Sequence, residues 1–258
     1  LRGCEVQLDL ASPEMGRRVL ESLRPDVIIH AAAYTQVDEA ERFPFQAFQV
    51  NRDGSRWIAA TARDLGVPVI GLSTDYVFDG KGHRPYRETD LARPRGVYAR
   101  SKFAGERAVR QETYRHLIVR VASVFAPGGR NFVRTMGRLL SERTEVEVVA
   151  DQVSCPTPAG AIAQALLDMA ERALRPGFRD WGLYHFAGGP AVSWHAFTEA
   201  IGQRLPGPVA HIVPTTTAAF GLPAPRPAYS ALDCSRIRNV FGIRPPVWAN
   251  WLDETLQG

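Results

Sequence analysis

The chain has 258 residues, 45% of them hydrophobic and 22% charged, which is typical of a globular protein with a substantial core. The net charge of +4 is spread along the chain, so nothing favours nucleic-acid binding, and no run of about 18 apolar residues indicates a membrane span. The cysteines (Cys4, Cys155 and Cys234) are odd in number and far apart, which argues against a disulfide framework or a zinc site and favours a cytoplasmic protein.

Short apolar runs rich in valine and isoleucine alternate with helical patterns in the first part of the chain. The runs occupy residues 26–33, 67–74, 116–125 and 145–150. They predict strands that are buried on both faces of a parallel sheet. Helices are predicted at residues 12–23, 44–65 and 97–111. This alternation predicts an α/β fold with a doubly wound parallel sheet.

After about residue 150 the character of the sequence changes, because prolines cluster there. Helices predicted at residues 158–174 and 193–204 flank a short strand, GLYHFAG. We therefore assign residues 1–150 to a dinucleotide-binding sheet domain and residues 151–258 mainly to a smaller substrate-binding lobe. Ligands of such sheets bind at the carboxyl ends of the strands, which directs attention to the residues that end the first two runs.

The glycine-rich turn of a dinucleotide-binding sheet is absent. That turn joins the first strand to a helix whose N-terminus holds the pyrophosphate. Since the first strand is central in the doubly wound order, its loss would leave buried backbone groups unpaired. We therefore expect about 30–40 residues, one βαβ unit's worth, to precede Leu1 in the complete protein. The alternative is a chain that never bound a dinucleotide.

The segment GVYARSK (96–102) places Tyr98 and Lys102 four residues apart, on one face of a predicted helix. The spacing alone is common, and a solvated helix pair would also explain it. However, Lys81 and Lys102 are the only lysines among 31 basic residues, so arginine supplies almost every other positive charge. A lysine at position 102 therefore indicates a need for a compact ammonium group, whereas Lys81 lies in a GKG loop.

Several segments, taken in this order, make the chain similar to the dTDP-4-dehydrorhamnose reductases, which are extended short-chain dehydrogenases/reductases. They are RPDVIIHAAAYTQVDEAE, STDYVFDG, VYARSKFAGE, NFVRTM, DQVSCPTPA and RPAYSALD. The resemblance implies a Rossmann-type fold with a smaller C-terminal substrate lobe. It also implies NADPH-dependent reduction of the 4-keto group of dTDP-4-dehydro-6-deoxy-L-mannose to give dTDP-L-rhamnose. NADH remains an alternative cofactor, because the residues that read the 2′-phosphate would largely precede Leu1.

The family's Ser/Thr–Tyr–Lys triad falls on Thr74, Tyr98 and Lys102. Tyr98 would give a proton to the carbonyl oxygen as that oxygen gains negative charge. Lys102 would hold the ribose of the cofactor and lower the pKa of Tyr98. Thr74 would hydrogen-bond the same oxygen and steer it. Without the resemblance, Thr74 would be interpreted as an ordinary threonine at the end of a strand.

The resemblance implies contacts on both sides of the triad. The cofactor would meet Asp9, Leu10, Ala32, Ala33, Thr35 and Ser73, besides Tyr98 and Lys102. The sugar nucleotide would meet Val37, Thr74, Tyr76, Ser123, Asn131 and Arg226. Asn131 equally suits a helix N-cap, since it precedes FVRTM. Arg226 could hold the diphosphate or be an ordinary surface arginine.

Position 123 departs from the family pattern T-S-W-V-[YF], in which the tryptophan packs on the sugar. The chain has Ser123 there, so that stacking face is missing, and the reductase of another 4-keto-deoxysugar nucleotide becomes an alternative. A 4,6-dehydratase or epimerase of the same superfamily is disfavoured, because Thr74–Asp75 is followed by Tyr76 rather than by a second carboxylate.

The remaining alternative is a reductase-like regulatory or binding subunit without catalysis, although the whole triad is present. The sequence itself indicates no metal site and no nucleic-acid or membrane partner. A homodimer, and Mg²⁺ at a dimer contact, are raised by the resemblance alone.

Overall fold

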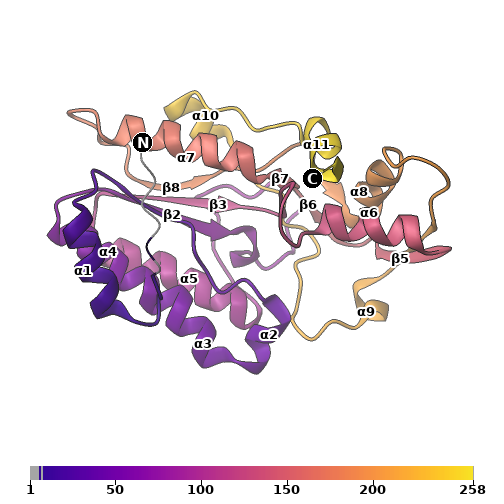
Figure 1. The fold of residues 1–258 in the computed structure, drawn as a ribbon, viewed down its shortest axis with the longest axis horizontal. Helices are drawn as coiled ribbons and strands as arrows, with labels where there is room; N and C mark the ends of the chain where they lie inside the picture. The colour runs from indigo at the N-terminus through magenta and orange to yellow at the C-terminus, as the bar shows by residue number, and fades with distance from the viewer. Residues whose placement is uncertain (1–5, 7, 258) are drawn as a thin grey trace.

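A computed structural model describes residues 6 and 8–257. Its centre is a four-stranded parallel sheet in the order β1–β2–β3–β8. The strands are β1 (Ile28–His30), β2 (Val69–Thr74), β3 (His116–Val121) and β8 (Gly182–His185). Helices cover both faces of this sheet, as Figure 1 shows, so the predicted α/β architecture is confirmed.

Each face of the sheet has its own set of helices. On one face lie α1 (Pro13–Leu23), α4 (Ser55–Asp64) and α5 (Gly96–Glu112), and on the other α7 (Ala159–Ala173) and α10 (Ser235–Phe241) (Figure 1). Successive residues of β3 point to opposite faces, as the pleat requires. Leu117 and Val119 join the core under α7, whereas Ile118 packs with Trp57 and Val109 under α4 and α5. The sheet is therefore buried on both sides.

The apolar run 116–125 forms two strands, which corrects the prediction of one. β3 ends at Val121, and β4 (Val124–Phe125) pairs with β7 (Thr157–Pro158) in a different sheet. Between them Ser123 adopts a φ of 45°, in the left-handed region that side chains other than glycine seldom occupy. The chain turns at this residue, away from the main sheet and toward the C-terminal part of the molecule.

Two further strands lie in other sheets than expected. β5 (Glu145–Val149) is not in the main sheet; it pairs in parallel with β10 (His211–Thr215). Its valines are mostly buried but Glu145 and Glu147 are exposed, so this strand has only one apolar face. Conversely, β8 was expected in the C-terminal lobe but lies in the main sheet beside β3. The main sheet therefore draws strands from both sides of residue 150.

The C-terminal lobe surrounds a second apolar cluster that includes Phe125, Val133, Phe197 and Trp248. Its elements are α6 (Phe132–Glu142), β5, α8 (Trp194–Gly202), β10 and α11 (Leu252–Gln257), which lie together at the right of Figure 1. β6 (Val153–Ser154) pairs antiparallel with β9 (Val192–Ser193). A short helix, α9 (Thr217–Phe220), follows β10. None of the helices in the described part of the chain is long and apolar enough to cross a membrane.

The helix predicted at residues 44–65 contains a π-helical turn. It consists of α3 (Pro44–Phe48), the π-helical turn Gln49–Gly54 and α4, and it follows α2 (Val37–Arg42), which the sequence did not predict. The turn brings Asn51 against α5, where its Nδ2 donates to Ser101 Oγ at 2.9 Å. Gly105 makes this approach possible, since a Cβ there would lie 2.2 Å from the Asn51 carbonyl oxygen.

Candidate active site

The carboxyl end of β2 and the first turns of α5 bring the three triad residues to one place. Thr74 ends β2, and Tyr98 and Lys102 follow one another on the face of α5 that packs against that strand. Thr74 Oγ1 accepts the backbone N–H of Tyr76 at 3.2 Å, and the ring of Tyr98 meets that of Tyr76 edge-on with centroids 5.9 Å apart. The arrangement places a phenol and a hydroxyl where a ligand of a parallel sheet binds.

Lys102 is buried, and its Nζ donates to the carbonyl oxygen of Leu72 at 2.8 Å. Burial lowers the pKa of Lys102 to about 8, while the carboxylate of Glu106 acts in the opposite direction. The charge of Lys102 in turn helps burial to lower the pKa of His30 to about 4. At neutral pH the site therefore holds one compact cation beside a neutral imidazole.

A buried ion pair lies directly behind this lysine. Arg120 of β3 makes two hydrogen bonds to Glu106 of α5, at 2.8 and 2.7 Å, and both side chains are 3% exposed. Ser73 Oγ also donates to Glu106, at 2.5 Å. The side chain of Ser73 therefore lies between β2 and α5, and it does not face the crevice. Thr74, the next residue in the strand, points the other way.

The pKa of Tyr98 is raised to about 12, mainly because the phenol is desolvated, whereas its hydrogen bond with Thr74 acts to lower it. Nearby Asp75 adds to the increase. The charge of Lys102 was expected to lower the pKa of Tyr98, so the direction of the shift is opposite to the prediction. The ammonium group of Lys102 is hydrogen-bonded to the Leu72 carbonyl oxygen. Tyr98 is consequently fully protonated at neutral pH and fits the role of a proton donor.

Asp75 is a buried carboxyl group at the end of a chain of hydroxyls. Burial raises its pKa to about 6, against hydrogen bonds from Ser230, Thr74 and Ser154 that lower it. Ser154 Oγ lies 3.4 Å from Asp75 Oδ2, and Ser123 Oγ donates to Ser154 Oγ at 2.8 Å. The hydroxyl of Ser123 therefore points to Ser154, where the family pattern has an indole.

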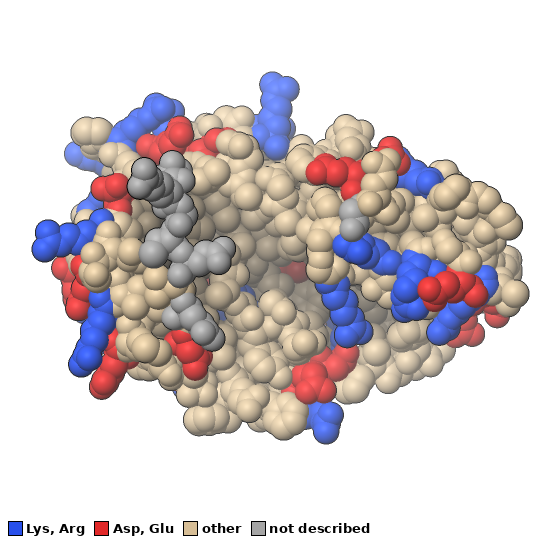
Figure 2. Space-filling view, in the orientation of Figure 1, with Lys and Arg blue, Asp and Glu red and all other residues tan. Residues whose placement is uncertain are grey.

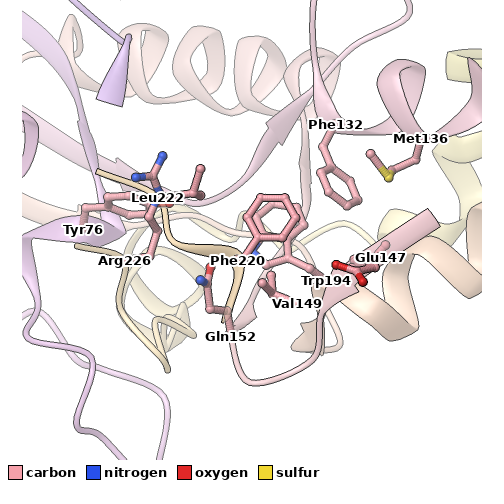
Figure 3. A pocket seen from close by; sticks show the side chains of 11 residues that line it. Tyr76, Phe132, Met136, Glu147, Val149, Gln152, Trp194, Phe220, Leu222 and Arg226 are labelled. Carbon is pink, nitrogen blue, oxygen red and sulfur yellow. The ribbon is translucent and has the colours of Figure 1, made fainter. Parts of the chain in front are cut away.

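A cavity of about 260 Å³ opens beside Tyr76, between the main sheet and the C-terminal lobe. Figure 3 shows Tyr76 and Arg226 at one end and the aromatic side chains of Phe132, Trp194 and Phe220 further along. Phe132 and Trp194 have centroids 4.3 Å apart. Figure 2 shows this face of the molecule hollowed between its two parts, with basic side chains beside the hollow toward the C-terminal lobe. The cavity combines flat apolar faces with one guanidinium, a combination that suits a base and a phosphate.

Arg226 is held by a carboxylate from the other part of the molecule. Its guanidinium forms a two-pronged ion pair with Asp38 of α2, at 2.6 and 2.7 Å, and it also donates to the Ala224 carbonyl oxygen at 2.7 Å. The pair lowers the pKa of Asp38. The backbone N–H of Ala224 donates to the same carboxylate at 3.1 Å. The segment around Arg226 is thereby tied over α2, next to Tyr76.

Three of the residues expected on the cofactor side follow the end of β1: Ala32 and Thr35 are exposed, and Ala33 is half-buried. Val37, expected on the substrate side, is half-buried at the start of α2. Asp9 is also exposed, and its carboxylate accepts the backbone N–H of Ala11 at 2.9 Å. The Leu10 carbonyl oxygen accepts the indole N–H of Trp57 at 2.9 Å. These two contacts fix the start of α1.

Asn131 is a helix cap. Its Oδ1 accepts the N–H of Arg134 at 3.2 Å, and its Nδ2 donates to the Ala126 carbonyl oxygen at 2.7 Å. Of the two interpretations given to Asn131, the structure supports the N-cap. The sequence did not single out the pocket aromatics Phe132, Trp194 and Phe220, because they resemble the core face of ordinary amphipathic helices.

In the part of the chain that the structure describes, no group of three or more His, Cys, Asp or Glu residues could hold a metal ion. Cys155 and Cys234 are buried free thiols whose pKa values burial raises, to about 11 and about 12. Cys4 lies outside the described residues. His30, Glu106 and Asp75 are titratable groups near the triad, and they form no such metal-binding group among the described residues.

Comparison with known proteins gives consistent matches. Residues 2–258 match the family model described as the RmlD substrate binding domain. The dTDP-4-dehydrorhamnose reductase of Sinorhizobium fredii is 42% identical over 244 residues, 93% of this chain and 82% of that protein. The dTDP-4-dehydrorhamnose reductase of Aggregatibacter actinomycetemcomitans is 40% identical over 247 residues, which are 94% of this chain and 84% of that protein. The Bacillus anthracis dTDP-4-dehydrorhamnose reductase, solved in complex with NADP, matches with a TM-score of 0.90 at 33% identity, over 97% of this chain and 86% of that one.

Proposed function

The chain belongs to the dTDP-4-dehydrorhamnose reductase family, and from this premise we propose what its own site does. The protein reduces the 4-keto group of dTDP-4-dehydro-6-deoxy-L-mannose to give dTDP-L-rhamnose, with NADPH as the reductant. The observation that carries the proposal is the convergence of Thr74, Tyr98 and Lys102 at the carboxyl end of β2.

Tyr98 acts as the general acid. Its pKa of about 12 keeps it protonated in the resting site, and a developing alkoxide on the substrate is basic enough to take the proton. The Thr74 hydroxyl then stabilises the phenolate that Tyr98 becomes, since their hydrogen bond lowers the pKa of Tyr98. The two residues together let one proton move over a short distance.

Lys102 fits the ribose of a dinucleotide. An ammonium has three N–H donors, and within the described residues Lys102 uses one of them, toward Leu72. The remaining donors suit vicinal hydroxyl groups, and the exposed small residue Ala32 at the end of β1 leaves room for a flat ring system. When bound there, NADPH supplies the hydride. Lys102 orients it and keeps a positive charge in the site.

The sugar nucleotide lies along the cavity that begins at Tyr76. Phe132, Trp194 and Phe220 offer aromatic faces to the base, and Arg226 offers a planar fork to the diphosphate. Arg226 would have to share its guanidinium between Asp38 and the phosphate oxygens. Because Ser123 provides no indole, the sugar itself is held mainly by polar groups near Thr74 and Tyr76.

The test is NADPH consumption by the complete protein with dTDP-4-dehydro-6-deoxy-L-mannose, beside a Tyr98→Phe variant. We expect turnover that falls about 100-fold or more in the variant, because it loses its general acid but keeps its ring. Other dTDP-4-keto-6-deoxysugars serve as competing substrates. Preference for one of them would replace the rhamnose assignment, and no reduction of any of them would refute the reductase function.

A further inference from the structure

We propose that Asp38 is a positioning residue for the diphosphate of the sugar nucleotide: it holds the guanidinium of Arg226 so that one edge of that group stays free to bind phosphate oxygens. This inference rests on the proposed function, in which the sugar nucleotide occupies the cavity beside Tyr76. It assigns a role to a carboxylate whose negative charge, by itself, is unfavourable near a diphosphate.

The hydrogen bonds of Arg226 occupy two edges of its guanidinium and leave the third. Nη1 and Nη2 donate to the two oxygens of Asp38, at 2.6 and 2.7 Å, and Nη1 also donates to the Ala224 carbonyl oxygen at 2.7 Å. An arginine side chain has five N–H donors, so two remain, one on Nε and one on Nη2. These two lie side by side on one edge, which is the two-donor fork that a phosphate group accepts.

The free edge belongs to a side chain that lines the cavity. Arg226 and Tyr76 lie at the same end of it, as Figure 3 shows. The side chain of Arg226 is 11% exposed, whereas that of Asp38 is 38% exposed. Water therefore screens the charge of the carboxylate more than it screens that of the guanidinium. The attraction of a bound diphosphate to Arg226 consequently exceeds its repulsion by Asp38.

The backbone on both sides of Arg226 is restricted as well. Pro225 and Pro227 flank it, and proline has a fixed φ and restricts the residue before it to extended backbone. The backbone N–H of Ala224 donates to Asp38 Oδ1 at 3.1 Å, so one carboxylate holds both the chain and the side chain. A long side chain that is ordered only when the ligand binds weakens binding through lost rotamer freedom. Asp38 orders Arg226 before the ligand arrives.

The helix that carries Asp38 is itself anchored to the helix of the general acid. Glu41, one turn after Asp38 in α2, accepts the backbone N–H of Val97 at 2.7 Å, and the residue after Val97 is the general acid. A Cβ on Gly96 would lie 2.7 Å from Glu41 Oε1 and 3.1 Å from the ring of Pro225, so the three segments meet there. One short helix therefore fixes the phosphate fork relative to the first turn of α5.

Glu39 provides a matched control. It is the next residue in α2, carries the same charge and pairs with Arg42 of its own helix at 3.3 Å. Asp38→Asn removes one negative charge and weakens the hold on Arg226. Glu39→Gln removes one negative charge from the same helix and leaves that hold intact. A difference between the two variants therefore reports the positioning of Arg226 and not the loss of charge.

The first measurement is calorimetric titration of the complete protein with dTDP and with thymidine, in the presence of NADP⁺. We expect Asp38→Asn to weaken dTDP binding about three- to tenfold, because the ligand must then order Arg226 itself. Thymidine has no phosphate, so its affinity should be unchanged, which also shows that the variant is folded. Glu39→Gln should bind both ligands as the unmodified protein does.

Three results of this titration would overturn the proposal. One is equal or tighter dTDP binding by Asp38→Asn, which would mean that the carboxylate only competes with the diphosphate. Another is an equal loss of thymidine affinity, which would give Asp38 a purely structural role. The third is an unmodified protein that does not bind dTDP.

The second measurement tests whether Asp38 acts through Arg226. In Arg226→Gln, which lacks the fork, adding Asp38→Asn should weaken dTDP binding no further, because no guanidinium is left to hold. Additive losses in the double variant would refute the proposal, since Asp38 would then act by another route.

Neither measurement needs turnover, so NADPH consumption by the same preparations tests the reductase function separately. Reduction of a keto sugar with equal dTDP affinities in Asp38→Asn and Glu39→Gln would refute only the role of Asp38. Binding of dTDP that depends on Asp38, without reduction of any keto sugar, would refute only the reductase function.

Discussion

The ammonium nitrogen of Lys102 lies 2.8 Å from the carbonyl oxygen of Leu72, two residues before the strand ends at Thr74. The pKa of this lysine is lowered to about 8 by burial, so its charge is lost as the pH rises through that value. We therefore expect kcat/KM to fall above about pH 8, with the protonated form active. A pH profile of the complete protein measures this.

The chain supplies its own control for that profile. Lys81→Arg alters the only other lysine, in an exposed loop, and should leave the alkaline limb in place. Lys102→Arg should lose most activity, because a planar guanidinium is too wide for the space between α5 and β2. An alkaline limb that persists unchanged in Lys102→Arg would assign the titration to another group.

Asp75→Asn should make the protein more stable at pH 7. The native state binds the Asp75 proton more tightly than the unfolded chain, since the pKa rises from 3.8 to about 6. Stability is therefore lost as the pH rises from about 4 to above 6, and the neutral amide avoids that loss. The shift of two pKa units corresponds to on the order of 3 kcal/mol. Urea unfolding at pH 7 and pH 4 should show a gain that shrinks at the lower pH; a less stable variant at pH 7 would contradict this.

Arg120→Met should destabilise the fold strongly. It leaves the carboxylate of Glu106 buried without its partner, and removal of one partner from a buried ion pair typically lowers the free energy of unfolding by about 3–5 kcal/mol. It also removes the guanidinium that lies 5.0 Å from the ring centroid of Phe78. The double variant Glu106→Gln/Arg120→Met should recover much of the loss in urea unfolding, because no unpaired charge remains. A single variant as stable as the original would mean that water reaches Glu106.

Arg226→Gln should raise KM for the sugar nucleotide about tenfold or more and change kcat little. A charge-assisted hydrogen bond to phosphate contributes about 1.5–3 kcal/mol, and glutamine offers only a neutral amide. Arg226→Lys should recover part of the affinity, since it keeps the charge but not the fork. Steady-state kinetics at two salt concentrations measures both. A loss confined to kcat would instead assign Arg226 to holding Tyr76.

Much of the fold was predictable because it depends on patterns that are local in sequence. The helix expected at residues 97–111 is α5 (Gly96–Glu112), and the runs at 26–33 and 67–74 contain β1 and β2. The strand partners were not predictable in the same way. An apolar run does not reveal which sheet it joins, so β5 and β8 were each expected in the wrong part of the molecule.

The candidate site shows the same division. The chemistry-bearing residues Tyr98 and Lys102 were recognised from their spacing and from the scarcity of lysine. The direction in which burial shifts the pKa of Tyr98 could not be read from sequence, because it depends on the desolvation of the phenol in the folded site. The ion pair between Asp38 and Arg226 joins residues 188 positions apart, and no local sequence pattern predicts such a contact.

The π-helical turn at Gln49–Gly54 makes this part of the gene intolerant of a change in length. A π-helical turn holds one residue more than the α-helical turn it replaces, so removal of one codon there would restore regular α-helical hydrogen bonding between α3 and α4. The wider turn that brings Asn51 to Ser101 would then be lost. We therefore expect insertions and deletions to be found in the loops of homologous genes but not across these six residues.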